Sequence, residues 1–199
     1  MNSKKQLRSL AYQSRNNQQN KDYLSRIICD KFIDQAAYQQ ADTIMWYLHC
    51  RSEVRTLASV MTQLNTSKKI IIPYCTRNER SENTLGLWWL EDMTELSTGT
   101  WGILEPPKTR WEEKDKQVLP TELDLIMVPG VAFDRQGGRL GNGAGYYDHL
   151  LNEVRSDTQL TAVCYQSQLY DSLPMENHDI YMDAILTEQN TFIIKKNGL

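Results

Sequence analysis

Three consecutive segments near the start of the chain alternate between strand-like and helix-like patterns, and this alternation constrains the fold more than any other feature. The run TIMWYLH at residues 43–49 is short and rich in strand-forming residues, whereas SEVRTLASVMTQL at residues 52–64 has helical spacing. KKIIIPYC at residues 68–75 is again a strand pattern, which Pro73 is expected to stop. A strand, a helix and a strand in so few residues predict a βαβ unit with parallel strands.

The rest of the chain continues the alternation. The first 40 residues predict two helices separated near NNQQN. Further strands are expected at GLWWLED, LIMV, LTAVCYQ, AILT and TFIIK, with irregular chain around GILEPPKTR and one helix of about ten residues after the glycine-rich stretch. We therefore expect a single three-layer α/β domain over residues 1–199.

Composition limits the classes of function. With 199 residues, 40% hydrophobic and 24% charged, the chain has the size and composition of one globular domain. A net charge of −3 provides no sequence-wide basic field, so we expect no nucleic-acid partner. The N-terminal segment lacks a secretory pattern and no apolar run approaches membrane-spanning length, so we expect a cytoplasmic protein without a membrane partner. The four scattered cysteines have no metal-binding spacing.

The stretch RLGNGAGYYDHLL at residues 139–151 is the strongest candidate for a binding site, because three glycines alternate with other residues ahead of a helical pattern. A Walker A loop would need a lysine and a Ser or Thr after the last glycine, and neither is present. A dinucleotide fingerprint would need the third glycine one position later and an acidic residue about twenty residues on, which is also missing.

Two interpretations of the glycine stretch remain open. In the first, the backbone N–H groups of Gly141, Gly143 and Gly145 bind a phosphate at the start of a helix, where the helix dipole favours an anion. Arg139 would then pair with the phosphate, and Asp148 could hold a divalent ion beside it. In the second, the glycines form a tight turn before a helix.

Other candidates have ordinary explanations from the residue pattern alone. Lys4 and Arg8 are four residues apart and could reach one anion together, but the residue pattern alone favours a solvated basic first turn. Glu53 is expected in the first turn of a helix capped by Ser52, where the helix dipole favours a carboxylate. It could alternatively accept hydrogen bonds from a polar heterocycle at the end of the first strand. Trp101 is expected in the core or in a pocket wall.

The segment VPGVAFDRQGGRLGNGAGYYDHLL resembles the signature of the 5-formyltetrahydrofolate cyclo-ligase family. KKQLR, SEVRT, GTWGILEPP and HDIYMDAILTE also occur in the order in which that family has them, so the resemblance covers nearly the whole chain. It implies a Rossmann-like three-layer fold with a mostly parallel central sheet. It also implies conversion of 5-formyltetrahydrofolate to 5,10-methenyltetrahydrofolate, which requires ATP and Mg²⁺ and releases ADP and phosphate.

The resemblance also implies roles for individual residues. Arg139 and Tyr146 would act in catalysis, and Asp148 and Asp183 would bind the metal ion. Residues implied to contact ATP are Lys4, Lys5, Arg8, Arg139, Leu140, Gly141, Asn142, Gly143, Ala144, Gly145, Tyr146 and Tyr147. Residues implied to contact the folate are Glu53, Trp101, Asn142, Gly143, Ala144, Gly145 and Tyr146.

Two positions depart from residues common in the family. Many relatives carry Tyr, Arg or Met where this chain has Asn142, and Gly or Lys where it has Ala144. Ala144 lacks a possible cationic contact to the phosphates, and we expect this to change rate or affinity rather than to abolish activity. The alternatives are an inactive folate- or ATP-binding protein and an ATP-dependent enzyme of the same fold with another substrate. We expect a monomer that acts on a small molecule.

Overall fold

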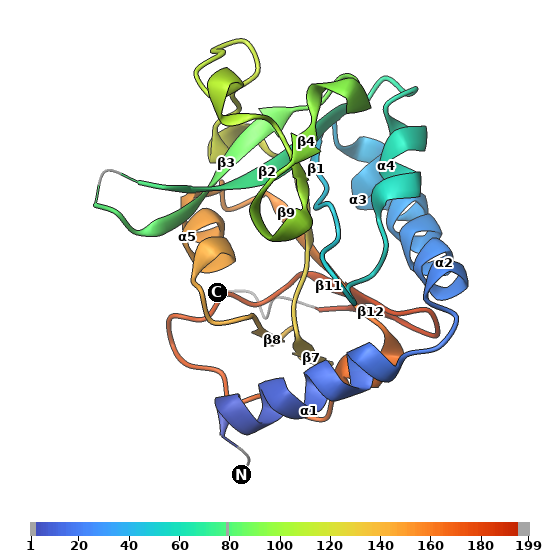
Figure 1. Ribbon diagram of the computed structural model, residues 1–199. Helices are drawn as coiled ribbons and strands as arrows, with labels where there is room; N and C mark the ends of the chain where they lie inside the picture. Colours follow the sequence, from blue (N-terminus) through green and yellow to red (C-terminus); the bar gives the residue numbers. More distant parts are fainter. Residues whose placement is uncertain (1–2, 79, 195–199) are drawn as a thin grey trace.

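The computed structural model describes residues 3–78 and 80–194 (Figure 1). Within them, the central sheet has seven strands in the order β12-β11-β9-β6-β1-β2-β3. These are β1 (Thr43–Met45), β2 (Lys69–Arg77), β3 (Asn83–Trp89), β6 (Leu125–Val128), β9 (Gln159–Val163), β11 (Ala184–Leu186) and β12 (Thr191–Ile193). Strands β2, β1, β6, β9 and β11 are parallel, while β3 and β12 pair antiparallel at the edges. The expectation of a mostly parallel sheet is confirmed.

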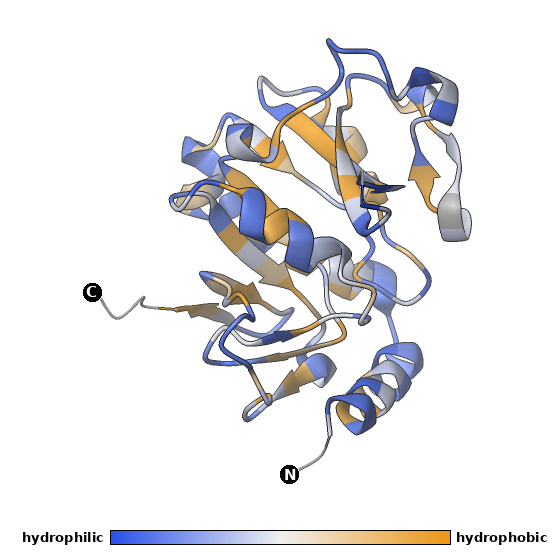
Figure 2. Ribbon diagram, turned by 90° about the vertical axis from the view of Figure 1, so that its left-hand side faces the viewer, coloured by the Kyte–Doolittle hydropathy of each residue, from blue (hydrophilic) through white to orange (hydrophobic). Residues whose placement is uncertain are grey.

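Helices cover both faces of this sheet and complete the three layers. The helices α2 (Lys21–Asp34), α3 (Ala36–Gln40) and α4 (Leu57–Gln63) contribute to the apolar cluster that contains Ile44 and Trp46. The helix α5 (Tyr146–Glu153) contributes Leu150 to a second cluster, which contains Met45. Successive residues of β1 therefore point to opposite faces, as the pleat requires. Apolar residues concentrate on the central strands (Figure 2).

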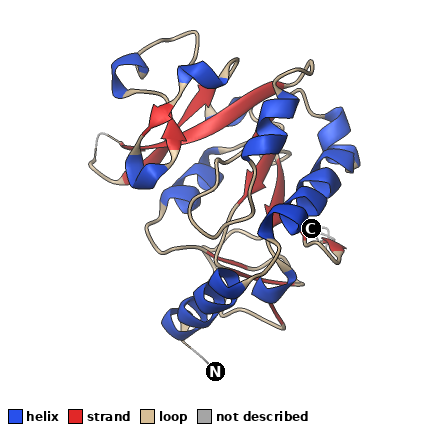
Figure 3. Cartoon of the chain, turned by 45° about the vertical axis from the view of Figure 1, so that its right-hand side comes forward, coloured by secondary structure: helices blue, strands red, loops and turns tan. Residues whose placement is uncertain are grey.

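The helix α1 (Lys4–Asn17) lies apart from the helices that flank the sheet (Figure 3). Its Leu7 and Ala11 belong to a separate apolar cluster with Leu140 and Leu173. This cluster joins α1 to a small sheet of β10 (Leu169–Tyr170), β7 (Ala132–Asp134) and β8 (Arg139–Leu140). The remaining short elements are β4 (Ser97–Thr98), β5 (Leu104–Glu105) and the 3₁₀ turns η1 (Met93–Glu95), η2 (Thr100–Gly102), η3 (Lys108–Arg110), η4 (Pro120–Glu122) and η5 (Gln166–Gln168).

Pro73 does not stop the second strand, so that expectation is wrong: it lies inside β2, opposite Leu87. The Leu90 N–H donates to the Ile70 carbonyl at 2.9 Å. Because hydrogen-bonded and non-hydrogen-bonded pairs alternate along an antiparallel ladder, the pair of Pro73 and Leu87 is non-hydrogen-bonded. The proline nitrogen consequently faces β1, where the Trp46 N–H donates to the Ile71 carbonyl at 2.8 Å. Pro73 has no N–H with which to continue this parallel ladder, so the pairing of β1 with β2 ends there.

The helix expected from residue 52 begins only at Leu57. Ser52 does not cap it, because the Ser52 hydroxyl accepts a hydrogen bond from Arg15 at 3.0 Å. Thr56 instead anchors the preceding loop by donating its hydroxyl to the Tyr47 carbonyl at 2.6 Å. Residues 46–56 are therefore a loop at the carboxyl end of β1, and Glu53 belongs to this loop.

No helix among residues 3–78 and 80–194 has both the length and the apolar character required to cross a membrane.

Asp134 organises the turn between β7 and β8. Its buried carboxylate accepts hydrogen bonds from the N–H groups of Gln136 at 3.0 Å, Gly138 at 2.8 Å and Leu173 at 2.8 Å. We expect Asp134→Ala to lower the free energy of unfolding by about 2–4 kcal/mol, because three N–H groups lose their acceptor. Urea denaturation measures this, with Asp171→Ala at an exposed aspartate as the control. Equal losses in both variants would contradict this role.

Candidate functional site

A cavity of about 320 Å³ lies at the carboxyl ends of β1 and β6. The chain leaves β1 toward α4 on one face of the sheet and reaches α5 on the other face after β6. The two strands therefore flank a topological switch point, where ligands of open α/β sheets bind. The residues that line the cavity are Tyr12, Arg15, Tyr47, Leu48, Cys50, Arg51, Glu53, Pro73, Cys75, Leu85, Trp101, Ile103, Glu105, Pro129, Gly130, Arg139 and Gly141 to Asp148.

The glycine stretch forms one wall of this cavity and leads into α5. Gly143 has a φ of +88° and Gly145, at the N-cap of α5, a φ of +81°, a region that strongly favours glycine. Arg8 reaches this loop from α1, because its Nε donates to the Gly141 carbonyl at 2.8 Å. The Ala144 carbonyl accepts a hydrogen bond from the Asn83 side chain at 3.1 Å. Both α1 and the β2–β3 hairpin thus hold the loop beside a helix N-terminus that favours anions.

Arg139 and Asp148 form an ion pair at the start of α5. The Arg139 side chain is only 6% exposed, whereas that of Asp148 is 64% exposed. The buried Nε of Arg139 has no hydrogen-bond partner among the residues that the structure describes. A buried guanidinium N–H without a partner is costly, so Arg139 has unused donor capacity in the cavity wall.

Glu53 supplies a buried carboxylate on the opposite side of the cavity. Its side chain is 12% exposed, and its Oε2 accepts a hydrogen bond from the Cys50 N–H at 2.9 Å. Burial raises the pKa of Glu53, while the Cys50 N–H and the Arg15 charge act in the opposite direction. The helix-dipole interpretation is wrong, because Glu53 precedes α4 and lies in the cavity wall.

Aromatic and sulfur-containing side chains form the rim of the cavity. Trp101 is 56% exposed and contacts the Tyr146 ring edge-on, with ring centroids 5.9 Å apart. Burial raises the pKa of Cys75 to about 11, and Cys75 also interacts with the Tyr146 side chain. Trp101 is therefore a pocket residue, as one of the two sequence interpretations expected, and it offers an aromatic surface to a planar ligand.

The structure brings most of the candidate residues to this one cavity. Those that line it are Glu53, Trp101, Arg139, Gly141, Asn142, Gly143, Ala144, Gly145, Tyr146, Tyr147 and Asp148. Arg8 does not line the cavity but contacts residues 141–145, called the glycine loop below, through the Gly141 carbonyl. Leu140 is not in the lining, because its side chain packs under α1 with Leu7 and Ala11.

Lys4 and Lys5 lie one turn before Arg8 and do not line the cavity. Lys4 forms ion pairs with Glu176 at 2.9 Å and Asp179 at 3.0 Å. Burial lowers the pKa of Lys4, but these two carboxylates raise it by more, so the net shift is upward. Lys5 is exposed on the first turn of α1.

Asp183 is not brought together with Asp148. It precedes β11, at the end of the sheet where the parallel strands begin, and its Oδ2 accepts a hydrogen bond from the Leu160 N–H at 2.8 Å. Asp148 lies at the other end, in the cavity wall. No group of three or more His, Cys, Asp or Glu residues in the described part of the chain could hold a metal ion.

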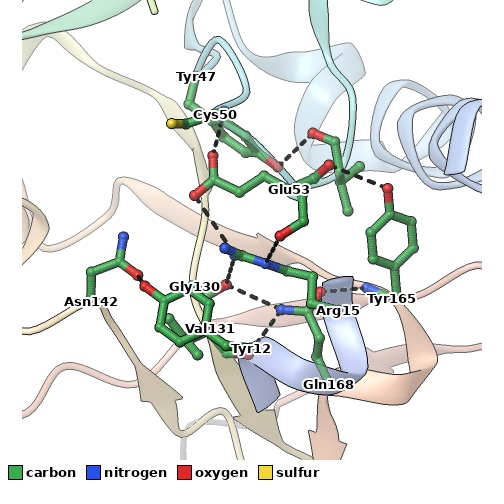
Figure 4. Close-up of polar contacts among 12 residues, drawn as sticks. Tyr12, Arg15, Tyr47, Cys50, Glu53, Gly130, Val131, Asn142, Tyr165 and Gln168 are labelled. Carbon is green, nitrogen blue, oxygen red and sulfur yellow. Dashed lines mark hydrogen bonds and ion pairs between the residues drawn. The ribbon is translucent and has the colours of Figure 1, made fainter. Parts of the chain in front are cut away.

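Tyr12 and Arg15 are cavity residues that the sequence reasoning did not single out (Figure 4). The Tyr12 hydroxyl hydrogen-bonds to the Asn142 side chain, so α1 contacts the glycine loop a second time. A signal was available in the helix pattern, because Leu7, Ala11 and Arg15 follow one another at intervals of four on the buried face of α1. An arginine on an apolar helix face is unusual enough to indicate a specific partner.

The comparisons with known proteins agree with one another. A sequence model of the 5-formyltetrahydrofolate cyclo-ligase family matches residues 1–188. The 5-formyltetrahydrofolate cyclo-ligase of Mycolicibacterium smegmatis is 33% identical, over 76% of this chain and 76% of its own length. The mouse 5-formyltetrahydrofolate cyclo-ligase is 28% identical, over 94% of this chain and 90% of its own length.

A solved structure extends the likeness to three dimensions. The NMR structure of the 5,10-methenyltetrahydrofolate synthetase of Aquifex aeolicus superposes with a TM-score of 0.81 at 29% identity. The superposition covers 98% of this chain and 94% of that one. Because the family match, the curated relatives and the fold all coincide, this chain is an enzyme that belongs to the 5-formyltetrahydrofolate cyclo-ligase family.

Proposed function

We propose that this enzyme converts 5-formyltetrahydrofolate to 5,10-methenyltetrahydrofolate with cleavage of ATP and release of ADP and phosphate. The observation that carries the proposal is the meeting of Glu53, Trp101, Arg139 and the glycine loop in one cavity at the switch point of a chain of this family. A buried acceptor and an aromatic rim suit a pterin ring. The amides at the start of α5 and Arg139 suit a polyphosphate.

The chemistry requires activation of a poor leaving group. The formyl oxygen attacks the γ-phosphorus of ATP and displaces ADP, which places a phosphate on the formyl carbon. The folate N10 then attacks this carbon and loses its proton, and the C–O bond breaks as phosphate leaves with the former formyl oxygen. The product carries the five-membered ring, and no group of the enzyme is modified.

The residues of the cavity contribute position and charge to these steps. Arg139 stabilises the negative charge of the transferred phosphoryl group, because its buried guanidinium has a donor to spare. The glycine loop holds the phosphates, and Tyr146 lies beside it with its ring against Trp101. Glu53 accepts hydrogen bonds from the pterin edge. Catalysis of this kind consists of alignment and charge neutralisation.

The protein side chains alone supply too few ligands for Mg²⁺, so nucleotide phosphates would have to complete the site. Asp148 is the exposed carboxylate in the cavity wall, and Mg²⁺ at nucleotide sites is commonly held by one or two carboxylates, phosphate oxygens and waters. Asp148 would hold the ion and exchange its contact to Arg139 for it, which frees Arg139 for the phosphates. When bound, Mg²⁺ neutralises charge on the β- and γ-phosphates.

The first experiment measures near-ultraviolet absorbance of methenyltetrahydrofolate with purified protein, 5-formyltetrahydrofolate and Mg²⁺, with and without ATP. We expect the methenyl band to grow only when ATP is present. A flat trace, with binding of ATP and folate shown by calorimetry, would favour an inactive binding protein. A flat trace without folate binding would point to another substrate.

A second prediction concerns Asp148. We expect Asp148→Asn to lower turnover at least about tenfold at limiting Mg²⁺, with partial recovery at high Mg²⁺, because the amide is a weaker ligand than the carboxylate. The matched control is Asp157→Asn, since Asp157 is also exposed and paired with an arginine, Arg155, but does not line the cavity. An Asp148→Asn variant with the Mg²⁺ dependence of the unmodified enzyme would remove Asp148 from this role.

A third prediction concerns Ala144 in the glycine loop. We expect Ala144→Lys to lower the KM for ATP by up to about tenfold, because an added cation beside the phosphates makes one charge-assisted hydrogen bond. Ala144→Met is the control, because it adds a side chain of similar length without charge. Equal KM values for ATP in the two variants would show that charge at this position does not matter.

A further inference from the structure

Arg15 is buried in the wall of the cavity, with only 3% of its surface exposed. Its Nε donates to the Ser52 hydroxyl at 3.0 Å and its Nη1 donates to the Gly130 carbonyl at 3.2 Å. These contacts join α1 to the loop after β1 and to the end of β6 (Figure 4). Burial of a guanidinium group is costly unless a counter-charge is near, and Arg15 has one in Glu53.

The two carboxylate oxygens of Glu53 have different surroundings. Oε2 accepts the hydrogen bond from the Cys50 N–H, and Oε1 lies 3.8 Å from Arg15 Nη1. This separation is too long for a hydrogen bond but short enough for strong charge attraction in a buried site. Oε1 therefore retains its capacity to accept hydrogen bonds, while the arginine charge holds the carboxylate in place.

We infer that Arg15 is a positioning residue, which keeps the Glu53 carboxylate negatively charged and aimed into the cavity to receive N–H donors of the folate heterocycle. The inference rests on the proposed function, since it assigns Arg15 a part in folate recognition. The helix α1 then contributes to two parts of the site: Arg15 acts on Glu53, while Arg8 and Tyr12 contact the glycine loop.

Arg15 is the charged group that helps to keep Glu53 ionised, beside the Cys50 N–H, which lowers the pKa of Glu53 by more. Burial raises the pKa values of Tyr47 and Tyr147 well above their ordinary value, so both remain neutral, and it also raises the pKa of the Cys50 thiol. Burial raises the pKa of Glu53 as well, and the Arg15 charge opposes this. Loss of the Arg15 charge should therefore raise the pKa of Glu53 further.

This argument fixes the direction of a pH effect. Protonated Glu53 offers a weaker acceptor, so folate binding should weaken as the pH falls through the pKa of Glu53. Without the Arg15 charge this loss should begin at a higher pH. A purely structural role for Arg15, as an anchor between α1 and the strand ends, predicts lower stability without such a shift.

The experiment compares Arg15→Gln, Arg15→Lys and two controls in the absorbance assay from acidic to neutral pH. Arg26→Gln removes an arginine charge from an exposed site on α2, and Ser52→Ala removes an anchor of Arg15 without removing its charge. For Arg15→Gln we expect the KM for folate to rise about tenfold or more, with the KM for ATP changed less than about twofold. We expect the acid limb of kcat/KM for folate to move to higher pH only in Arg15→Gln.

A second measurement does not depend on activity. The pKa of Glu53 is followed by NMR of ¹³C-carboxyl-labelled protein, with the signal assigned by its absence in Glu53→Gln. We expect this pKa to be higher in Arg15→Gln than in the unmodified protein and close to the original in Arg15→Lys. If Arg15→Gln does not fold, Arg15→Met takes its place as the uncharged variant. A Glu53 pKa equal to that of the unmodified protein would then contradict the inference, and a higher pKa would support it.

The outcomes separate this inference from the proposed function. An unmodified protein without cyclo-ligase activity contradicts the proposed function, while the NMR titration still tests the coupling of Arg15 to Glu53. An active enzyme in which Arg15→Gln leaves the folate KM, the acid limb and the Glu53 pKa unchanged overturns the inference. Equal increases in the KM for folate and for ATP, with no shift in the acid limb, would also overturn it and leave Arg15 as a structural anchor.

Discussion

The divergence of the chain after β1 and β6 is the constraint on which the site depends. These neighbouring strands pair directly, but the segments that follow them lead to helices on opposite faces of the sheet. A space that no helix or strand fills therefore remains between the two segments that follow β1 and β6. The loop with Glu53 lines one side of this space, and Gly130 and the glycine loop line the other.

The early end of β1 enlarges this space. Pro73 presents no N–H toward β1, so the parallel ladder between β1 and β2 does not extend past its position. β2 continues with β3 as a long antiparallel hairpin, and Asn83 of this hairpin holds the Ala144 carbonyl. Pro73 was expected to end β2. It instead marks the point where β2 stops pairing with β1 while its pairing with β3 continues, and it lines the cavity there.

The two sides of the cavity carry groups of different charge. Glu53, with Arg15 beside it, presents a carboxylate in a largely buried setting, while Arg139 and the start of α5 present positive potential across from it. Under the proposed function, a pterin ring would offer its N–H donors to Glu53, and a polyphosphate would offer its anionic oxygens to Arg139 and the start of α5. The helix α1 contacts both sides through side chains on one face, with Arg8 and Tyr12 at the glycine loop and Arg15 at Glu53.

Structural features that depend on residues close together in the chain could be predicted from the sequence alone. The alternation of strands and helices predicted the parallel sheet, and the alternating glycines predicted a loop before α5, either a phosphate-binding loop or a tight turn. These signals are local, because pleat, helix turn and glycine backbone freedom act within one or two turns of chain. The start of α4 was misplaced, because Ser52 interacts with Arg15 rather than with its own helix.

Contacts between residues far apart in the chain were decided only by the tertiary structure. Strand order places Asp183 at the amino ends of the strands and Asp148 at the carboxyl ends, although the family resemblance assigned both to one metal ion. Packing of α1 on the small sheet directs Lys4 to Glu176 and Asp179, but brings Arg15 to Glu53. The sequence determined the local elements and the glycine-dependent loop before α5. Which side chains share the cavity follows from sheet topology and helix docking, because these set distances that sequence spacing does not contain.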